Sequence, residues 1–293
     1  MTASDSLGAA SPNAETIGLW NETLVPRFIR HRQVFVGASA PHSQEALARH
    51  PVGAGEAVLD VGCGFGETTI EIAQAVGPKG RALGVDVCEP FLAIARADAT
   101  RSGVPNARFR VADAQVERFD DKFDVCFSRF GTMFFSNPAA AFRNLRRCVK
   151  PEGRLLMIVW RPIEDNEWTL IARNAARVHL PPPPDEAPAC GPGPFSLADA
   201  DVVKAILAAA KWDQAALERV DRPINLGPTI EAAVEFMLTL GPAGQILREA
   251  GALGEAKRPA VAADLAERLR PFLTDAGVVM RAGSWCVSAR AGR

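Results

Sequence analysis

The sequence lacks the features that would send a chain to or through a membrane. No stretch approaches the roughly 20 consecutive apolar residues that a membrane helix needs. The first residues, MTASDSLGAASPNAET, contain neither the basic segment nor the apolar run of a signal peptide. We therefore expect a cytoplasmic protein with no membrane insertion.

The sequence also lacks an excess of charge of one sign. Its formal net charge is −1, charged residues make up 23% and hydrophobic residues 48%. A chain with this balance has no overall field that would gather nucleic acid or an anionic membrane surface. The composition favours a protein that binds small molecules and no nucleic acid.

Paired cysteines are missing as well. The chain has no C-x-x-C pair and no Cys/His cluster with the spacing of metal ligands. We therefore expect reduced thiols, with neither disulfides nor a metal site, and several of these thiols lie in apolar runs where cysteine acts as a small hydrophobic residue. The six cysteines are Cys63, Cys88, Cys126, Cys148, Cys190 and Cys286.

The most informative segment that is present is VLDVGCGFGETT, residues 58–69. It has the pattern of a buried strand, a glycine-rich turn and the start of a helix. Gly62, Gly64 and Gly66 let backbone amides approach a ligand closely, and the helix adds its unpaired amides. Their G-x-G-x-G spacing differs from the G-x-G-x-x-G of dinucleotide-binding proteins. The spacing therefore points away from NAD and towards S-adenosyl-L-methionine.

Short apolar runs alternate with amphipathic segments up to Trp160. The pattern predicts strands at 58–61, 82–87, 107–111, 123–127 and 154–160, helices at 68–76, 89–101 and 138–149, and a turn at 150–153. Strands alternating with helices of this length indicate an α/β fold with a parallel sheet covered on both faces.

The pattern changes on either side of this core. We expect one or two helices within 15–50, a helix over 161–180, a stiff surface loop in the proline-rich segment 181–194, a helix capped by Ser196 and ending near Lys211, and mostly helix over 229–273. Weaker strand patterns occupy 216–226 and 284–289. No internal repeat is visible.

Five segments together carry a family resemblance. They are VLDVGCGFGETT, GVDVCEPFLAIA, RFRVADAQ, FDVCFSRFGTMFF and NPAAAFRNLRRCVKPEGRLLMIVW, in this order. The chain resembles class I S-adenosylmethionine-dependent methyltransferases over roughly residues 55–160, most of all the branch that includes the ubiquinone/menaquinone-biosynthesis enzymes. The resemblance implies a seven-stranded Rossmann-like α/β sheet, helices on both faces, a helical lid, and a last strand inserted antiparallel. The segments 216–226 and 284–289 would be the sixth and seventh strands.

The resemblance also implies a division of the chain. Residues 1–50 would form an N-terminal helical lid segment, and residues 51–160 the S-adenosylmethionine-binding core. Residues 161–293 would complete the sheet and contribute helical lid insertions at 161–195 and 228–275.

The glycine turn and the second strand end supply the first predicted cofactor residues. Asp60 would order the turn or meet the ammonium group of the cofactor, directly or through water. Gly62, Cys63, Gly64 and Gly66 form the turn itself. Asp86 ends the second strand, 24 residues after Gly62, where a carboxylate can accept two hydrogen bonds from a ribose diol.

Further positions follow from the resemblance alone. Asp113 would accept from the adenine amino group, and the Ala114 amide would serve a ring nitrogen. Val87 and Phe91 could pack on the adenine faces, although Phe91 fits a core position equally well. Thr69 and Ser128 would line the cofactor.

The end of the fourth strand bears on the acceptor. Amino-methyltransferases of nucleic acids carry an acidic residue or asparagine followed by Pro-Pro and an aromatic residue, whereas this chain has Ser128-Arg129-Phe130-Gly131. Phe130, Met133, Phe134 and Phe135 could form an apolar wall beside the sulfonium or pack in the core. We therefore expect a small, apolar or aromatic acceptor.

Catalysis needs few groups in this chemistry. Methyl transfer is an in-line displacement that depends on alignment and exclusion of water, so a base is optional. The histidines are His31, His42, His50 and His179. Any single one fits a surface or capping position better, and no catalytic base is assigned. We expect Trp20 and Asn21 to close over the donor.

The predicted function is S-adenosyl-L-methionine-dependent methyl transfer to an oxygen, nitrogen or carbon atom of a small molecule, with S-adenosyl-L-homocysteine as the product. The alternatives are an NAD-dependent oxidoreductase that uses the same turn, and a non-catalytic relative that binds the cofactor. The sequence leaves the acceptor atom and the oligomeric state open, a homodimer included.

Overall fold

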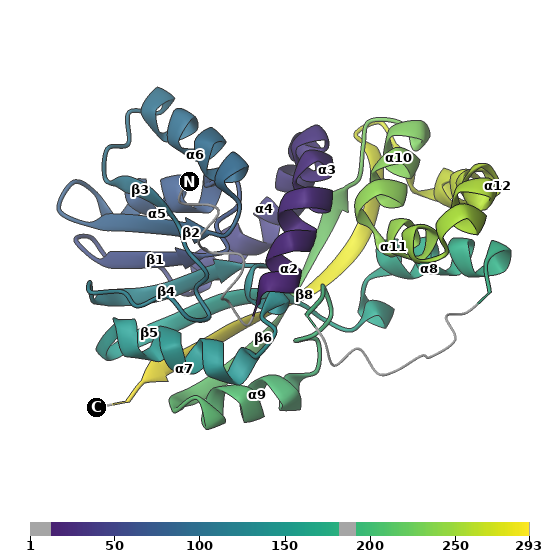
Figure 1. Ribbon diagram of the computed structural model, residues 1–293. Coiled ribbons are helices and arrows are strands. Elements are labelled where there is room, and N and C mark those ends of the chain that lie inside the picture. Colours follow the sequence, from purple (N-terminus) through teal and green to yellow (C-terminus); the bar gives the residue numbers. More distant parts are fainter. Residues whose placement is uncertain (1–12, 182–191, 293) are drawn as a thin grey trace.

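A twisted seven-stranded sheet forms the centre of the molecule (Figure 1). The computed structural model describes residues 13–181 and 192–292. Within them the strand order is β3-β2-β1-β4-β5-β8-β6, and a short strand, β7, pairs with β8. The strands are β1 (Ala57–Val61), β2 (Arg81–Asp86), β3 (Ala107–Val111), β4 (Phe123–Arg129), β5 (Val149–Trp160), β6 (Trp212–Asn225), β7 (Leu273–Thr274) and β8 (Gly277–Ala291).

Helices cover both faces of this sheet. Figure 1 shows α6 on one side of the sheet and α7 with α9 on the other. The helices are α2 (Ala14–Leu19), η1 (Trp20–Leu24), α3 (Val25–Arg30), α4 (Arg32–Arg49), α5 (Glu67–Val76), α6 (Glu89–Arg101), η2 (Thr132–Phe134), α7 (Pro138–Cys148), η3 (Ile163–Asp165), α8 (Glu167–His179), α9 (Ala200–Ala209), α10 (Ile230–Leu240), α11 (Pro242–Glu249), α12 (Gly251–Leu269) and η4 (Arg270–Phe272).

The strand pairing confirms the predicted fold class. Strands β1 to β5 pair in parallel, whereas β8 runs antiparallel to both of its neighbours, β5 and β6. This is an α/β sheet with an inserted antiparallel strand, as the resemblance implied. The carboxyl ends of the parallel strands lie along one edge, where open α/β sheets bind ligands.

Two local predictions were wrong. The expected turn at 150–153 lies inside β5 as a bulge: Val149 pairs with Phe123 and Arg154 with Val125, and Glu152 between them has a φ of 61°. Ser196 does not cap a helix, because its hydroxyl donates to the Met133 carbonyl oxygen at 2.6 Å. Asp199 caps α9 instead, so this helix begins at Ala200. Most of the predicted proline-rich loop, residues 182–191, lies outside the described residues.

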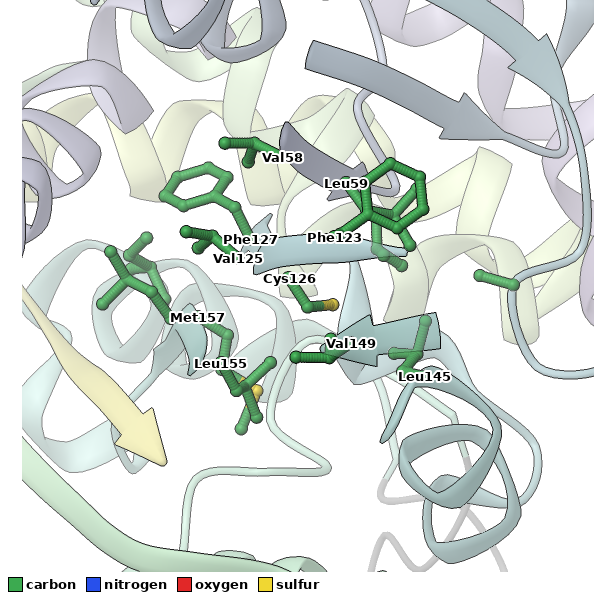
Figure 2. Close-up of a cluster of buried hydrophobic side chains, with 14 of the residues drawn as sticks. Val58, Leu59, Phe123, Val125, Cys126, Phe127, Leu145, Val149, Leu155 and Met157 are labelled. Atoms are coloured by element: carbon green, nitrogen blue, oxygen red, sulfur yellow. The ribbon is translucent and has the colours of Figure 1, made fainter. Parts of the chain in front are cut away.

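The largest apolar core holds the parallel strands together. Figure 2 shows Val58 and Leu59 of β1 beside Phe123 and Phe127 of β4, with Leu155 of β5 below them. All five side chains are almost completely buried. Burying a side chain of this size stabilises the fold by about 1.5 to 3 kcal/mol. The positions of the strand ends are therefore tightly fixed.

A second apolar core joins the helical part to the sheet. Helices α8, α10, α11 and α12 gather at one side of the molecule (Figure 1). They pack against the far ends of the two longest strands, through Ile224 of β6 and Val278 and Met280 of β8. The extended β6–β8 ribbon thus brings these helices to the carboxyl edge of the parallel strands.

The structure adds observations on membrane-spanning helices, metal sites and cysteines. None of the helices in the described ranges combines the length and apolar character that crossing a membrane requires. In the same ranges no group of three or more His, Cys, Asp or Glu side chains could hold a metal ion. Cys63, Cys88, Cys126, Cys148 and Cys286 are buried free thiols, and Cys190 lies outside the described residues.

Candidate functional site

A cavity lies at the carboxyl ends of the parallel strands. Its walls come from the turn after β1, the ends of β2 and β4, the segment after β3, and helices α2 to α4, α8 and α10. Seven predicted cofactor residues line it, namely Gly62, Cys63, Gly64, Asp86, Val87, Asp113 and Ala114. The remaining four, Asp60, Gly66, Thr69 and Ser128, lie behind the wall within the described structure.

The three glycines of the turn have different surroundings. All three have a positive φ, 66° at Gly62, 54° at Gly64 and 81° at Gly66. A Cβ at Gly62 would come within 2.8 Å of the Gly131 Cα, and a Cβ at Gly66 within 2.7 Å of Ala95. A Cβ at Gly64 would meet no atom within 4 Å. Gly62 and Gly66 are therefore required by packing, whereas Gly64 leaves room for a ligand.

Asp86 closes the turn from the neighbouring strand. Its carboxylate accepts hydrogen bonds from the Gly64 amide at 2.9 Å and the Cys88 amide at 3.0 Å. Burial raises the pKa of this carboxyl, and the amide hydrogen bonds oppose the change. Each carboxylate oxygen can accept more than one bond, so Asp86 can still accept from a ligand in the cavity.

Asp60 lies beneath the turn and is completely buried. One carboxylate oxygen accepts from the hydroxyls of Thr68 at 2.7 Å and Thr69 at 2.6 Å, while the other, Oδ1, has no hydrogen-bond partner among the described residues. Burial raises the pKa of Asp60 to about 6. Asp60 and Thr69 thus fasten the start of α5 to the end of β1, which is the loop-ordering role among those predicted for Asp60.

Ser128 supports the same region. Its hydroxyl donates to the Val61 carbonyl oxygen at 2.8 Å and the side chain is completely buried. This bond joins the ends of β1 and β4. Ser128 therefore holds the strands that carry the cavity rather than forming its surface.

The predicted adenine region is built from three segments. Asp113 and Ala114 follow β3, and Asp113 Oδ1 accepts from the Gln115 amide at 3.0 Å. Val87 and Phe91 line the cavity on the side of β2 and α6. Phe91 also packs against Phe65, with ring centroids 4.6 Å apart. It is thus both a core residue and a cavity residue.

The N-terminal helices cover this end of the cavity. Trp20 lines the cavity, and its ring lies 5.0 Å from that of Phe134. Asn21 donates from Nδ2 to the Val87 carbonyl oxygen at 3.4 Å. Phe28 and Phe35, which the sequence did not single out, line the same side. The helices therefore close over the predicted donor site through aromatic contacts and one hydrogen bond.

An apolar wall continues from the end of β4. Phe130, Met133, Phe134 and Phe135 all line the cavity. Phe130 stacks on Trp160, with centroids 3.9 Å apart and planes 17° apart, although its φ of 58° is uncommon for a residue with a side chain. A strained backbone that holds an aromatic ring at a cavity wall is typical of functional sites.

The helical part closes the apolar side. Trp168 of α8 and Phe236 of α10 line the cavity, and the Trp168 ring lies 5.8 Å from that of Trp160. The Trp168 indole nitrogen is buried and has no hydrogen-bond partner within the described chain. Sequence patterns could not assign these residues to the site, since they fit any amphipathic helix.

The histidines do not form part of the cavity wall in the described structure. The expectation of a surface or capping position was wrong for His42, which is completely buried with its Nδ1 2.8 Å from the Ser284 hydroxyl. Burial lowers the pKa of His42 to about 4. His50 pairs with Glu218 at 2.9 Å. The structure therefore assigns no histidine as a base.

Two charged residues of the wall were missed in the sequence. Arg129 ends β4, and Glu67 begins α5 directly after the glycine turn. Both line the cavity, and their closest charged atoms are 3.6 Å apart. Burial lowers the pKa of the Arg129 guanidinium, and the charge of Glu67 opposes the change. A charged residue at the carboxyl end of a parallel strand, where open α/β sheets bind ligands, was the signal that could have revealed Arg129.

Known proteins are similar to this chain in sequence and in fold. Residues 58–153 match the family model described as "Methyltransferase domain". Over these residues the chain is similar to methyltransferase domains. The solved structure of YcgJ from Bacillus subtilis covers 85% of this chain and 99% of its own, with a TM-score of 0.52 at 20% identity, which shows a common fold.

Curated relatives match about two fifths of this chain. The ubiquinone/menaquinone biosynthesis C-methyltransferase UbiE of Marinomonas sp. (strain MWYL1) is 31% identical over 117 residues, 39% of this chain and 47% of that protein. The aklanonic acid methyltransferase DauC of Streptomyces sp. (strain C5) is 30% identical over 134 residues, 43% of this chain and 61% of that protein. The match thus spans less than two thirds of these relatives.

Proposed function

We propose that the protein is an S-adenosylmethionine-dependent methyltransferase that acts on a small apolar or aromatic molecule. One observation carries the proposal. A single cavity joins a glycine turn with open space at Gly64, a carboxylate at the end of β2, and an aromatic wall formed by Phe130, Trp160 and Trp168. The first two features suit the adenosyl donor, and the wall suits the acceptor.

The residues present fit this cofactor. Asp86 would accept from the ribose diol, Asp113 from the adenine amino group, and the Ala114 amide would donate to a ring nitrogen. The room at Gly64 allows the methionine part to approach the backbone. The bound sulfonium supplies an activated methyl group. The chain supplies orientation of both reactants and, through its aromatic wall, exclusion of water.

The wider organisation belongs to the same proposal. The N-terminal helices within 1–50 and the insertions at 161–195 and 228–275 would act as the lid over the core at 51–160. The names of UbiE and DauC, a C-methyltransferase of quinone biosynthesis and an aklanonic acid methyltransferase, support a small-molecule acceptor. The acceptor atom would be oxygen, nitrogen or carbon, and the location cytoplasmic.

Calorimetric titration with S-adenosylhomocysteine tests the proposal. Asp86→Ala removes the two hydrogen bonds that the carboxylate would accept from the ribose hydroxyls, so we expect the dissociation constant to rise about 10- to 100-fold. Asp121→Ala is the control, because Asp121 is exposed and pairs with Arg81 away from the cavity. Unchanged affinity in Asp86→Ala would contradict the assignment.

Two further measurements address the alternatives. We expect no heat from NAD, because the glycine spacing and the methyltransferase relatives both argue against a dinucleotide enzyme. A panel of aromatic and apolar acceptors should yield labelled product from S-adenosylmethionine. Donor binding without transfer to any acceptor would favour a non-catalytic relative.

A further inference from the structure

Two arginine side chains near the cavity lack an acidic partner. Arg27 belongs to α3 and Arg248 to α11, and both side chains are half-buried. In the described part of the chain neither guanidinium forms an ion pair with a carboxylate, and the Arg27 side chain makes no hydrogen bond. The unpaired nitrogen atoms of both groups are accessible. Most of their N–H donors are therefore free to bind a ligand.

The two positive charges lie close enough together to repel each other. Burial lowers the pKa of Arg248, the charge of Arg27 lowers it further, and the charge of Glu249 opposes both effects to a smaller extent. Glu249 also accepts a hydrogen bond from Gln245 Nε2 at 2.8 Å. An anion between the two guanidinium groups would relieve this repulsion.

Helix contacts explain how the two arginines meet. Arg30 of α3 forms an ion pair with Glu235 of α10 at 3.2 Å, so these helices lie side by side. Arg27 lies about one turn before Arg30 on α3, and Thr239 about one turn after Glu235 on α10. Arg248 Nη1 donates to the Thr239 carbonyl oxygen at 3.3 Å. This bond holds the Arg248 guanidinium at the end of α10, on the side where Arg27 lies.

The same stretch of the two helices forms an apolar side of the cavity. Phe28 directly follows Arg27, Leu240 directly follows Thr239, and both line the cavity together with Phe236. Phe28 and Leu240 are only partly buried. Arg27 itself does not line the cavity, and neither does the second arginine. The cavity thus has an apolar interior here and positive charge just outside it.

We propose that Arg27 and Arg248 bind an anionic group, a carboxylate or a phosphate, that is carried by the methyl acceptor. The inference rests on the proposed function and narrows its acceptor to an amphipathic anion. The apolar or aromatic body lies inside the cavity, and the anionic group reaches out between α3 and α11. A guanidinium suits either anion because its planar N–H donors match two oxygen atoms at once.

The position of this site assigns it a role in specificity. Neither arginine lines the cavity, so the anchored group stays outside it, and the methylated atom belongs to the body of the acceptor. The two arginines come from separate helices of the helical part, whereas Asp86 and Asp113 belong to the strand ends. Their loss should therefore weaken the acceptor and leave the cofactor site unchanged.

The experiment compares probes that differ only in the charged group. The full chain, saturated with S-adenosylhomocysteine, is titrated by calorimetry with naphthylbutyric acid, its neutral amide and naphthylbutyl phosphate. The proteins are the wild type, each single variant and the double variant Arg27→Gln/Arg248→Gln. The control is Lys79→Gln/Arg108→Gln, which also removes two positive charges, at exposed positions in the turn before β2 and on β3.

We expect the wild type to bind at least one of the two anions about 10- to 100-fold more tightly than the amide, and the tighter anion identifies the group. In the double variant this ratio should fall below about twofold, and each single variant should lose part of it. The affinities for the amide and for S-adenosylhomocysteine should change by less than about twofold. The control variant should keep the ratio of the wild type.

Three results would overturn the inference while leaving the cofactor assignment intact. They are equal affinities of the wild type for the anions and the amide, a preference that survives in the double variant, and an equal loss of preference in the control. Binding of none of the naphthyl probes would overturn it together with the proposed apolar acceptor. Failure of the wild type to bind S-adenosylhomocysteine would instead overturn the proposed function itself.

Discussion

At the scale of single residues, Gly64 and Gly66 of the same turn differ in the space available to a Cβ atom. A Cβ at Gly66 would collide with Ala95 and Phe109, whereas a Cβ at Gly64 would enter free space. We predict that Gly66→Ala lowers the free energy of unfolding by roughly 2 to 4 kcal/mol, through overpacking and backbone strain. Urea denaturation measures this loss.

Gly64→Ala is the matched variant. Its backbone strain should cost about 1 kcal/mol of stability. Its Cβ would occupy cavity space, so we expect at least a roughly tenfold loss of S-adenosylhomocysteine affinity. The assignment of Gly64 to the ligand side would be wrong if this variant bound the ligand as tightly as the wild type.

Asp60 predicts a pH dependence of stability. Its pKa of about 6 in the folded protein lies above the ordinary 3.8 because the carboxyl is buried. Between these values the folded state binds more protons than the unfolded state, so the contribution of Asp60 to stability falls as pH rises from about 4 to 6. The loss should be on the order of 1 to 3 kcal/mol.

The test compares the wild type with Asp60→Asn across this pH range. The difference in free energy of unfolding between the two proteins should shift in favour of Asp60→Asn as the pH rises. Asp121→Asn, at an exposed position, should run parallel to the wild type. A pH-independent difference for Asp60→Asn would contradict the raised pKa.

At the scale of secondary structure, local chemistry defined most elements of the core. Glycine and proline residues mark the ends of these elements. The limits of α6 and β3 are therefore as predicted, and those of β1 and α7 differ from the predicted limits by one residue. The segment 229–273 was predicted as helical without internal boundaries. It forms three α-helices, which break at Gly241 and Ala250, and the short helix η4; the neighbouring packing decides where such a helix ends.

The attachment of α4 to the core gives a further prediction. Arg32 is the residue of α4 that bonds to Glu67 and Asp98, so Arg32→Gln should loosen the N-terminal helices over the cavity. We expect amide exchange within residues 25–40 to accelerate roughly tenfold, while that of β1 and β4 stays constant. Hydrogen exchange followed by mass spectrometry measures both.

Arg30→Gln provides the control for this experiment. Arg30 is largely exposed and pairs with Glu235 at 3.2 Å, so its loss should have little effect on exchange. Equal acceleration in both variants would mean that Arg32 has no special part in holding the N-terminal helices.

At the scale of the whole molecule, the sequence predicted the side of the cavity that the strand ends form. The residues of the strand ends, such as Asp86 and Asp113, follow a spacing that is visible along the chain. Phe35, Trp168 and Phe236 reach the cavity from three separate helices, and their own segments contain nothing that distinguishes them from core residues. Their convergence depends on tertiary packing, which periodicity does not specify.

Ligand binding should stabilise the whole fold. At 100 times its dissociation constant, S-adenosylhomocysteine would stabilise the native state by about 2.7 kcal/mol, which corresponds to a rise in Tm of roughly 4 to 8 °C. Scanning calorimetry measures the shift. NAD at the same concentration should leave Tm unchanged, and an equal rise with NAD would contradict the proposed cofactor.

The position of β8 has a consequence for biosynthesis. Its hydrogen bonds reach both β5 and β6, and in the described structure β6 pairs with no other strand. Until the ribosome has translated residues 277–291, β6 lacks its neighbouring strand β8 and exposes an unpaired edge. The nascent chain can therefore associate wrongly through this edge until residues 277–291 emerge. The parallel strands, in contrast, are complete once residue 160 has been translated.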